Sequence, residues 1–72
     1  MQRKLNIMKT VKVSKIIKML LADGWYLDKQ KGSHRQFKHP TKPGKVTVNH
    51  KESEDIWGAL LKSIEDQSGL KF

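Results

Sequence analysis

Glycine and proline punctuate the middle of this 72-residue chain and limit what it can fold into. Gly24, Gly32 and Gly44 each mark a turn, because glycine adopts the positive φ angles that tight turns require. Between the turns lie three stretches, residues 25–30, 33–39 and 45–49. Stretches of this length are typical of strands and too short for stable helices. The punctuation therefore predicts three consecutive antiparallel strands.

Apolar residues within these stretches predict which side of the sheet is buried. Side chains alternate between the two faces of a strand, so Trp25 and Leu27 share one face. Phe37 is the one large apolar residue of residues 33–39, and Val46 and Val48 are two apart. We expect these five residues to face the core. The same alternation places Arg35 and His39 with Phe37, and sends His34, Gln36 and Lys38 to the opposite, open face.

Amphipathic patterns before and after the strands predict two helices. The first covers about residues 14–23, with Ser14 as its N-cap and Gly24 at its C-terminal end. Its apolar stripe is Val13, Ile16, Ile17, Leu20 and Leu21. We expect Ser53 to cap the second helix, with Glu54 and Asp55 in its first turn. Its apolar stripe is Ile56, Leu60, Leu61 and Ile64, with Trp57 at the edge. Gly58 favours either close packing at that point or a later helix start.

The predicted fold is α+β, in the order helix, strand, strand, strand, helix. A three-stranded antiparallel sheet with both helices on one face would bury every apolar stripe in a single core. Residues 13–72 form one domain in this interpretation. Residues 1–12 are basic and weakly patterned, so we expect a flexible lead-in.

Charge is distributed unevenly along the chain. Residues 1–51 carry a net charge of +11 and residues 52–72 carry −3, which gives +8 for the whole. A basic body of this kind favours a polyanionic partner such as a nucleic acid, although many basic surfaces only confer solubility. Cysteine is absent, and no apolar run is long enough to span a bilayer. We therefore expect a cytoplasmic protein with no membrane contact.

The sequence lacks the residue patterns that most catalytic mechanisms require. No carboxylate pair lies near the strands, and no glycine-rich loop opens a helix in the manner of a phosphate-binding loop. His34, His39 and His50 match no metal-ligand spacing, so we expect neither a metal nor a small-molecule cofactor. Ser33 and His34 point to opposite faces of a strand and cannot act as a nucleophile pair. What remains is the His34 imidazole, which lies among cations.

Five stretches of the chain, residues 16–26, 31–37, 39–40, 46–48 and 68–70, resemble the HicA family of small toxins. The Gly32-Ser33-His34 block after Gly24-Trp25 is rather specific to that family. The resemblance implies a fold like the double-stranded RNA-binding domain and ribosome-independent cleavage of mRNA. Since no metal site is expected, the nuclease would be metal-independent. The resemblance also implies that His34 is the catalytic residue. The implied partner is a HicB-type antitoxin that covers the active site.

Three functions follow as hypotheses. In the first, the chain is an mRNA interferase, an endoribonuclease of a type II toxin–antitoxin system. His34 then acts as general acid or base, and a basic surface binds the RNA. The expected RNA contacts are Lys31, Gly32, Ser33, Arg35, Gln36 and Lys38. In the second, the same surface binds RNA without cleavage. In the third, the chain has lost catalysis and serves as the partner of an acidic antitoxin.

Overall fold

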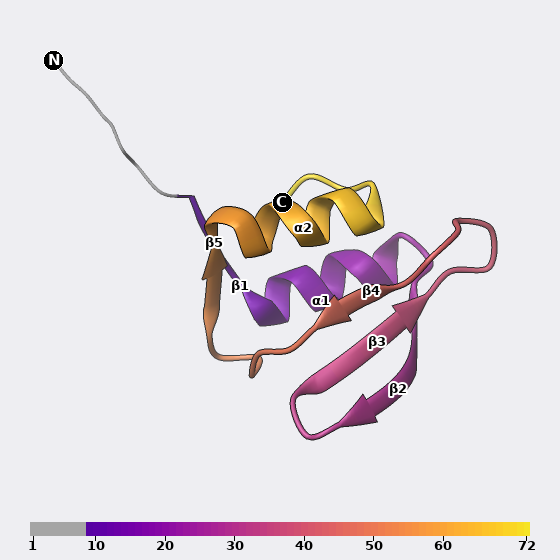
Figure 1. Cartoon of the computed structure of the whole chain (residues 1–72), viewed down its shortest axis with the longest axis horizontal. Coiled ribbons are helices and arrows are strands. Elements are labelled where there is room, and N and C mark those ends of the chain that lie inside the picture. Colours follow the sequence, from indigo (N-terminus) through magenta and orange to yellow (C-terminus); the bar gives the residue numbers. More distant parts are fainter. Residues whose placement is uncertain (1–8) are drawn as a thin grey trace, which may run out of the picture.

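The computed structural model describes residues 9–72, which form two helices and five strands (Figure 1). The elements in chain order are β1 (Thr10–Lys12), α1 (Val13–Ala22), β2 (Tyr26–Lys31), β3 (His34–Lys38), β4 (Val46–Val48), β5 (Asp55–Trp57) and α2 (Gly58–Ser68). The α+β fold predicted from the sequence is confirmed. Its three central strands form an antiparallel sheet in the order β2-β3-β4. The described part of the chain holds no helix with the length and apolar character required to cross a membrane.

The core lies between this sheet and the two helices. Eleven apolar side chains are almost fully buried there: Val11, Val13, Ile16, Leu20, Trp25, Phe37, Val46, Val48, Ile56, Leu61 and Ile64. Each burial removes apolar surface from water, which is the main favourable term in folding. Trp25, just before β2, and Phe37, in β3, are the largest of these side chains.

The β2–β3 hairpin projects beyond the helices, as Figure 1 shows in its lower part. Every residue of β2 is exposed as a consequence. Leu27 pairs with Phe37 on the core face but keeps 45% of its surface, so its predicted burial is wrong. Both faces of β2 are therefore open to solvent.

The apolar stripes of the two helices are also narrower than predicted, because Leu21 and Leu60 are 53% and 38% exposed.

The start of α1 differs from the prediction in how its amides are satisfied. Ser14 does not cap this helix, which begins at Val13 and has no side-chain cap. Backbone carbonyls take over, since the Val13 amide donates to the Glu54 oxygen at 2.9 Å and the Ser14 amide donates to Glu52 at 3.1 Å. Helix amides without an intrahelical acceptor need such partners. The segment that precedes α2 thereby fixes where α1 begins.

Gly24 ends α1, as predicted. Its φ is +103°, in the region that favours glycine. The Gly24 amide donates to the Leu21 oxygen and the Trp25 amide to the Leu20 oxygen, at 3.1 and 3.0 Å. This pair of bonds is a Schellman motif, which commonly joins a buried residue after the turn to one in the last helical turn. Here the two are Trp25 and Leu20, both in the core.

Two short strands that the sequence did not predict close the fold at the other end. Thr10–Lys12 pairs antiparallel with Asp55–Trp57, with Val11 opposite Ile56. The predicted lead-in is therefore wrong for residues 10–12, while its residues 1–8 lie outside the described part of the chain. The pairing buries Val11 and Ile56 against the core, which explains why this segment forms a strand.

Helix α2 consequently begins later than a Ser53 cap would require. It starts at Gly58, and Glu54 and Asp55 lie before it, so their predicted place in its first turn is wrong. Gly58 has φ +63°, and a Cβ atom there would meet nothing within 4 Å. Of the two predictions for Gly58, the later helix start is confirmed and close packing is wrong.

The chain ends in a tail that folds back on α2. Gly69 ends this helix with φ +76°, and Leu70 and Phe72 pack partly buried against the core. The Phe72 amide donates to the Glu65 carboxylate at 2.9 Å. This hydrogen bond holds the pKa of Glu65 below its ordinary value.

Candidate functional site

The sheet has one face without a helix, which we call the outer face. Phe37 is 1% exposed and points to the core, so its strand neighbours at every second position point the other way. His34, Gln36 and Lys38 of β3 therefore share the outer face, as the sequence predicted. Thr47 of β4 joins them, because it pairs with Gln36.

A β-bulge in β2 adds two lysines to this face. Leu27 pairs with Phe37, but the next pair joins Lys29 to Gln36, so one residue is inserted between the pairs. An inserted residue shifts the alternation by one position. Lys29 and Lys31 therefore come to the outer face, opposite Gln36 and His34. Strict alternation from Leu27 would place Asp28 there instead, so the sequence analysis did not identify Lys29 as a site residue.

These side chains surround an open hollow at the end of the hairpin. The hollow has a volume of about 460 Å³ and is lined by Lys29, Gln30, Lys31, His34 and Gln36. Every charged group in this lining is a cation. His34 is exposed to solvent, and none of the side-chain hydrogen bonds formed among residues 9–72 involves its ring. Both ring nitrogens can therefore reach a bound molecule.

A two-residue turn presents the histidine. Lys31 pairs with His34, which leaves Gly32 and Ser33 as the loop. Gly32 has φ +59°, the positive value that two-residue hairpin loops require at this position. The Gln30 side-chain amide donates to the Gly32 oxygen at 2.9 Å and braces the loop. His34 is thus the first residue of β3, at a defined position beside the turn.

Arg35 stands apart from the other predicted RNA contacts. It pairs with Val48 and Gln30, and its side chain, 11% exposed, lies on the core side. Its guanidinium donates to the His50 oxygen at 2.9 Å and lies 3.6 Å from the Glu52 carboxylate. Arg35 therefore fastens β3 to the segment after β4. The geometry brings Lys31, Gln36 and Lys38 together with His34, but not Arg35.

His39 is held in a different way, at the far end of β3. Its Nε2 lies 2.7 Å from the Asp23 oxygen, and its Nδ1 accepts from the backbone amides of Thr41 and Lys42, both at 3.1 Å. A nitrogen that accepts carries no proton, so the ring is neutral and Nε2–H donates to Asp23. The Trp25 ring packs edge-on at 5.2 Å. His39 is therefore a structural residue with both nitrogens occupied.

Asp23, His39, Lys42 and Ser68 form what we call the polar cluster. The Lys42 ammonium donates to the Asp23 carboxylate at 2.6 Å and to the Ser68 oxygen at 3.1 Å. The hydrogen bond from Lys42 holds the pKa of Asp23 below its ordinary value of 3.8. The cluster joins the ends of α1 and α2 to the β3–β4 connection.

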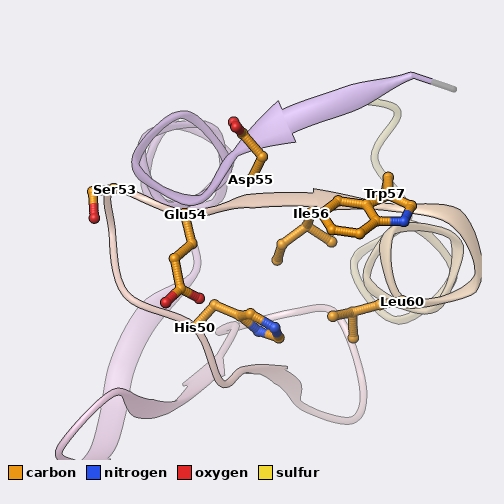
Figure 2. Close-up of a pocket in the computed structure, with 7 residues that line it drawn as sticks. All are labelled: His50, Ser53, Glu54, Asp55, Ile56, Trp57 and Leu60. Atoms are coloured by element: carbon orange, nitrogen blue, oxygen red, sulfur yellow. The ribbon is translucent and has the colours of Figure 1, made fainter.

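A second and larger hollow lies along β5 (Figure 2). Its volume is about 530 Å³, and its lining is His50, Ser53, Glu54, Asp55, Ile56, Trp57 and Leu60. Figure 2 shows the Glu54, Ile56 and Leu60 side chains reaching toward His50 on the facing segment. The charged groups of this lining are carboxylates, which repel phosphate. The smaller, cationic hollow is therefore the better candidate for a polyanion.

Residues 9–72 contain no group of three or more histidine, cysteine, aspartate or glutamate side chains placed to hold a metal ion. The chemistry available at the outer face is therefore that of one imidazole among ammonium groups. Such a set can move a proton next to a phosphate and stabilise the charge that develops there.

No curated protein matches the chain. A family model described as the HicA toxin of bacterial toxin-antitoxin matches residues 13–70, from the first residue of α1 to the tail after α2. The match includes the whole outer face.

Proposed function

Because this chain belongs to the HicA family of bacterial toxin–antitoxin toxins, we propose that it is an mRNA interferase that cleaves RNA at the outer face. The observation that carries the proposal is the His34 imidazole. It is exposed, unbonded within the described chain, and placed in a hollow whose charged lining is entirely cationic. An imidazole changes protonation state near neutral pH, which suits it to acid and base catalysis.

RNA needs little from such a site, since it brings its own nucleophile. The 2′-oxygen attacks the adjacent phosphorus as its proton leaves, and the bond from phosphorus to the 5′-oxygen breaks. The products are a 2′,3′-cyclic phosphate and a 5′-hydroxyl. His34 either takes the proton from the 2′-hydroxyl or supplies one to the departing 5′-oxygen. No step requires a metal ion or another cofactor.

The lysines supply the electrostatic part of the mechanism. Lys31 is the cross-strand neighbour of His34, and Lys29 is the next outer-face residue of β2. Ammonium groups at these positions stabilise the negative charge that builds on the phosphate during cleavage. Lys38 lies four residues from His34, about 13 Å along an extended strand. It holds a neighbouring phosphate and so helps to orient the RNA.

Three of the predicted contacts take indirect roles in this proposal. Gly32 and Ser33 shape the turn that presents His34, and Ser33 also accepts from Arg35 at 3.4 Å through its backbone oxygen. Arg35 acts as a positioning residue, because its guanidinium is engaged with His50 and Glu52. The RNA itself meets Lys29, Lys31, Gln36 and Lys38.

The test is cleavage of a 5′-labelled, unstructured RNA by the purified chain in the presence of EDTA. We expect fragments that end in a cyclic phosphate, and a loss of roughly 10²- to 10⁴-fold in rate for His34→Ala. Cleavage by His34→Ala at the wild-type rate would refute the proposal. If the wild-type chain binds the RNA but leaves it intact in EDTA and with added Mg²⁺, the chain is a binding module instead.

A toxin of this family implies an antitoxin partner. We propose that a HicB-type antitoxin covers the outer face with an acidic surface, because the excess positive charge there would steer it. Co-expression with the product of the adjacent gene tests this. We expect copurification, relief of toxicity and protection of the RNA. A partner that copurifies but leaves cleavage unchanged contradicts the proposed position.

A further inference from the structure

One aromatic side chain lies on the outer face and has no part in the mechanism above. Tyr26 pairs with Lys38, so the two side chains lie on the same side of the sheet as His34. The Tyr26 side chain is 48% exposed, whereas Trp25 beside it is 2% exposed and faces the core. No side-chain hydrogen bond within residues 9–72 involves the Tyr26 hydroxyl. A large apolar ring is thus presented to solvent among lysines.

The register places Tyr26 at one end of a short track of outer-face pairs. Tyr26 with Lys38 comes first, Lys29 with Gln36 follows, and Lys31 with His34 is last. At about 3.3 Å per residue, the first and last pairs are about 13 Å apart. Stacked nucleotides rise about 3.4 Å each, so this distance corresponds to at most about four nucleotides of one strand. An RNA strand cleaved at His34 can therefore reach Tyr26.

We propose that Tyr26 is a stacking site for an unpaired base, so that the outer face takes single-stranded RNA. The inference rests on the proposed function and adds its substrate class. Proteins that bind single strands combine a cationic track with aromatic rings on which bases stack. The exposed Tyr26 ring and the lysines beside it supply both elements. A base inside a duplex already has neighbours on both sides, so its face is closed to the ring.

If Tyr26 stacks on a base, its removal should weaken binding of single-stranded RNA more than binding of duplex RNA. An exposed tyrosine without this role would not produce that difference. Stacking of one base on an aromatic side chain accounts for about a 5- to 150-fold change in affinity. Tyr26→Ala should weaken binding to a single strand by a factor in this range. It should change binding to a duplex of the same composition by less than about 3-fold, because phosphate contacts dominate there. Tyr26→Phe should restore the single-strand affinity, since the ring remains.

The experiment uses the full chain with His34→Ala, so that the RNA stays intact while its dissociation constant is measured. The probes are a labelled unstructured RNA and a hairpin RNA of equal length, both at one fixed salt concentration. Trp57→Ala is the matched control, because Trp57 is 51% exposed but lines the acidic hollow. It should leave both affinities unchanged. Thermal unfolding of each variant confirms that the fold is kept.

A second measurement locates the base. Single-stranded RNAs with one abasic nucleotide at successive positions should lose affinity at one position, within about four nucleotides of the phosphate that the wild-type chain cleaves. Tyr26→Ala should remove that position-specific loss. If Tyr26→Ala weakens single strand and duplex equally, or leaves both unchanged, the stacking inference is overturned while the nuclease stands. If Tyr26 selects single strands but the wild-type chain cuts no RNA, the stacking site stands and the nuclease fails.

Discussion

Two histidines five residues apart in one strand region divide this molecule into two kinds of polar site. The His34 ring on the outer face is open to solvent and takes part in none of the side-chain hydrogen bonds among residues 9–72. The His39 side chain, 11% exposed, has both nitrogens occupied by Asp23, Thr41 and Lys42. An imidazole whose nitrogens are already bonded cannot exchange a proton without losing those bonds. The partners around a histidine, more than its presence, therefore decide whether it can act on a substrate.

The charges around the two histidines differ in the same direction. In the polar cluster, the Lys42 ammonium is matched by the Asp23 carboxylate at 2.6 Å. Around His34 the charged lining is Lys29 and Lys31, and no carboxylate belongs to it. The cluster is thus locally neutral and stabilises the fold, whereas the outer face keeps an uncompensated positive charge for a partner.

The largest effect that separates the two sites is expected from alanine at each histidine. His34→Ala should reduce RNA cleavage by roughly 10²- to 10⁴-fold and leave the free energy of unfolding within about 0.5 kcal/mol. His39→Ala should cost about 1–3 kcal/mol of stability, because it strands the amides of Thr41 and Lys42 and the oxygen of Asp23. Cleavage per folded molecule should change little. Denaturant unfolding measures the stability of each variant, and a cleavage assay at low temperature measures its activity. The same loss of activity in His34→Ala and His39→Ala would contradict the different roles of the two histidines.

Each histidine lies near a glycine with a positive φ, so glycine substitutions extend the contrast between the two sites to the backbone. An alanine Cβ at Gly24 would lie 2.8 Å from His39 Nε2, at φ +103°. Gly24→Ala should therefore cost about 1–3 kcal/mol from backbone strain and more from the displaced ring. Gly32→Ala is the matched change in the His34 loop, where φ is +59° and a Cβ meets nothing within 4 Å. It should cost about 1–2 kcal/mol. Urea unfolding compares the free energies of unfolding of the two variants. Equal losses would show that the position of the His39 ring does not depend on the absence of a side chain at Gly24.

Local sequence patterns predicted those parts of the fold that depend on local physics. Gly24 ends the first helix because it adopts a positive φ, and Phe37 fixes the inner face of β3 because it is the large apolar residue there. Glycine position and apolar alternation can be read from a few neighbouring residues. The open face with His34, Gln36 and Lys38 followed from the same alternation.

The features that the sequence missed depend on distant or unmarked contacts. No glycine or proline marks the bulge at Asp28, yet the bulge decides that Lys29 lies on the outer face. Thr10–Lys12 becomes a strand through partners more than forty residues away, which a local pattern cannot show. The contacts of Arg35 with a carbonyl and a carboxylate beyond β4 were also not predicted. Gly58 was the one local signal of the later start of α2.

Acid should weaken the polar cluster more than the outer face. The hydrogen bond from Lys42 lowers the pKa of Asp23 in the folded state, so the unfolded chain binds the proton more readily. The resulting stability is present above the ordinary Asp23 value of 3.8 and is lost as the pH falls through the lower folded value. As the pH decreases from 6 to 2, the melting temperature should therefore fall more steeply for the wild-type chain than for Asp23→Asn. Parallel curves would mean that this ion pair contributes nothing.

The smallest effect is expected from one lysine of the outer face. Lys29→Ala should weaken binding of single-stranded RNA to the His34→Ala chain by a modest factor, without dependence on base sequence. Each phosphate contact contributes about 0.7 to the slope of log affinity against log salt concentration for a single strand. The slope should therefore fall by about that amount. Lys62→Ala is the matched control, because Lys62 is exposed on α2, away from the sheet, and pairs with Asp66 at 3.4 Å. If both variants lower the slope equally, RNA responds to the overall charge of the chain, and the bulge that turns Lys29 to the outer face has no role in binding.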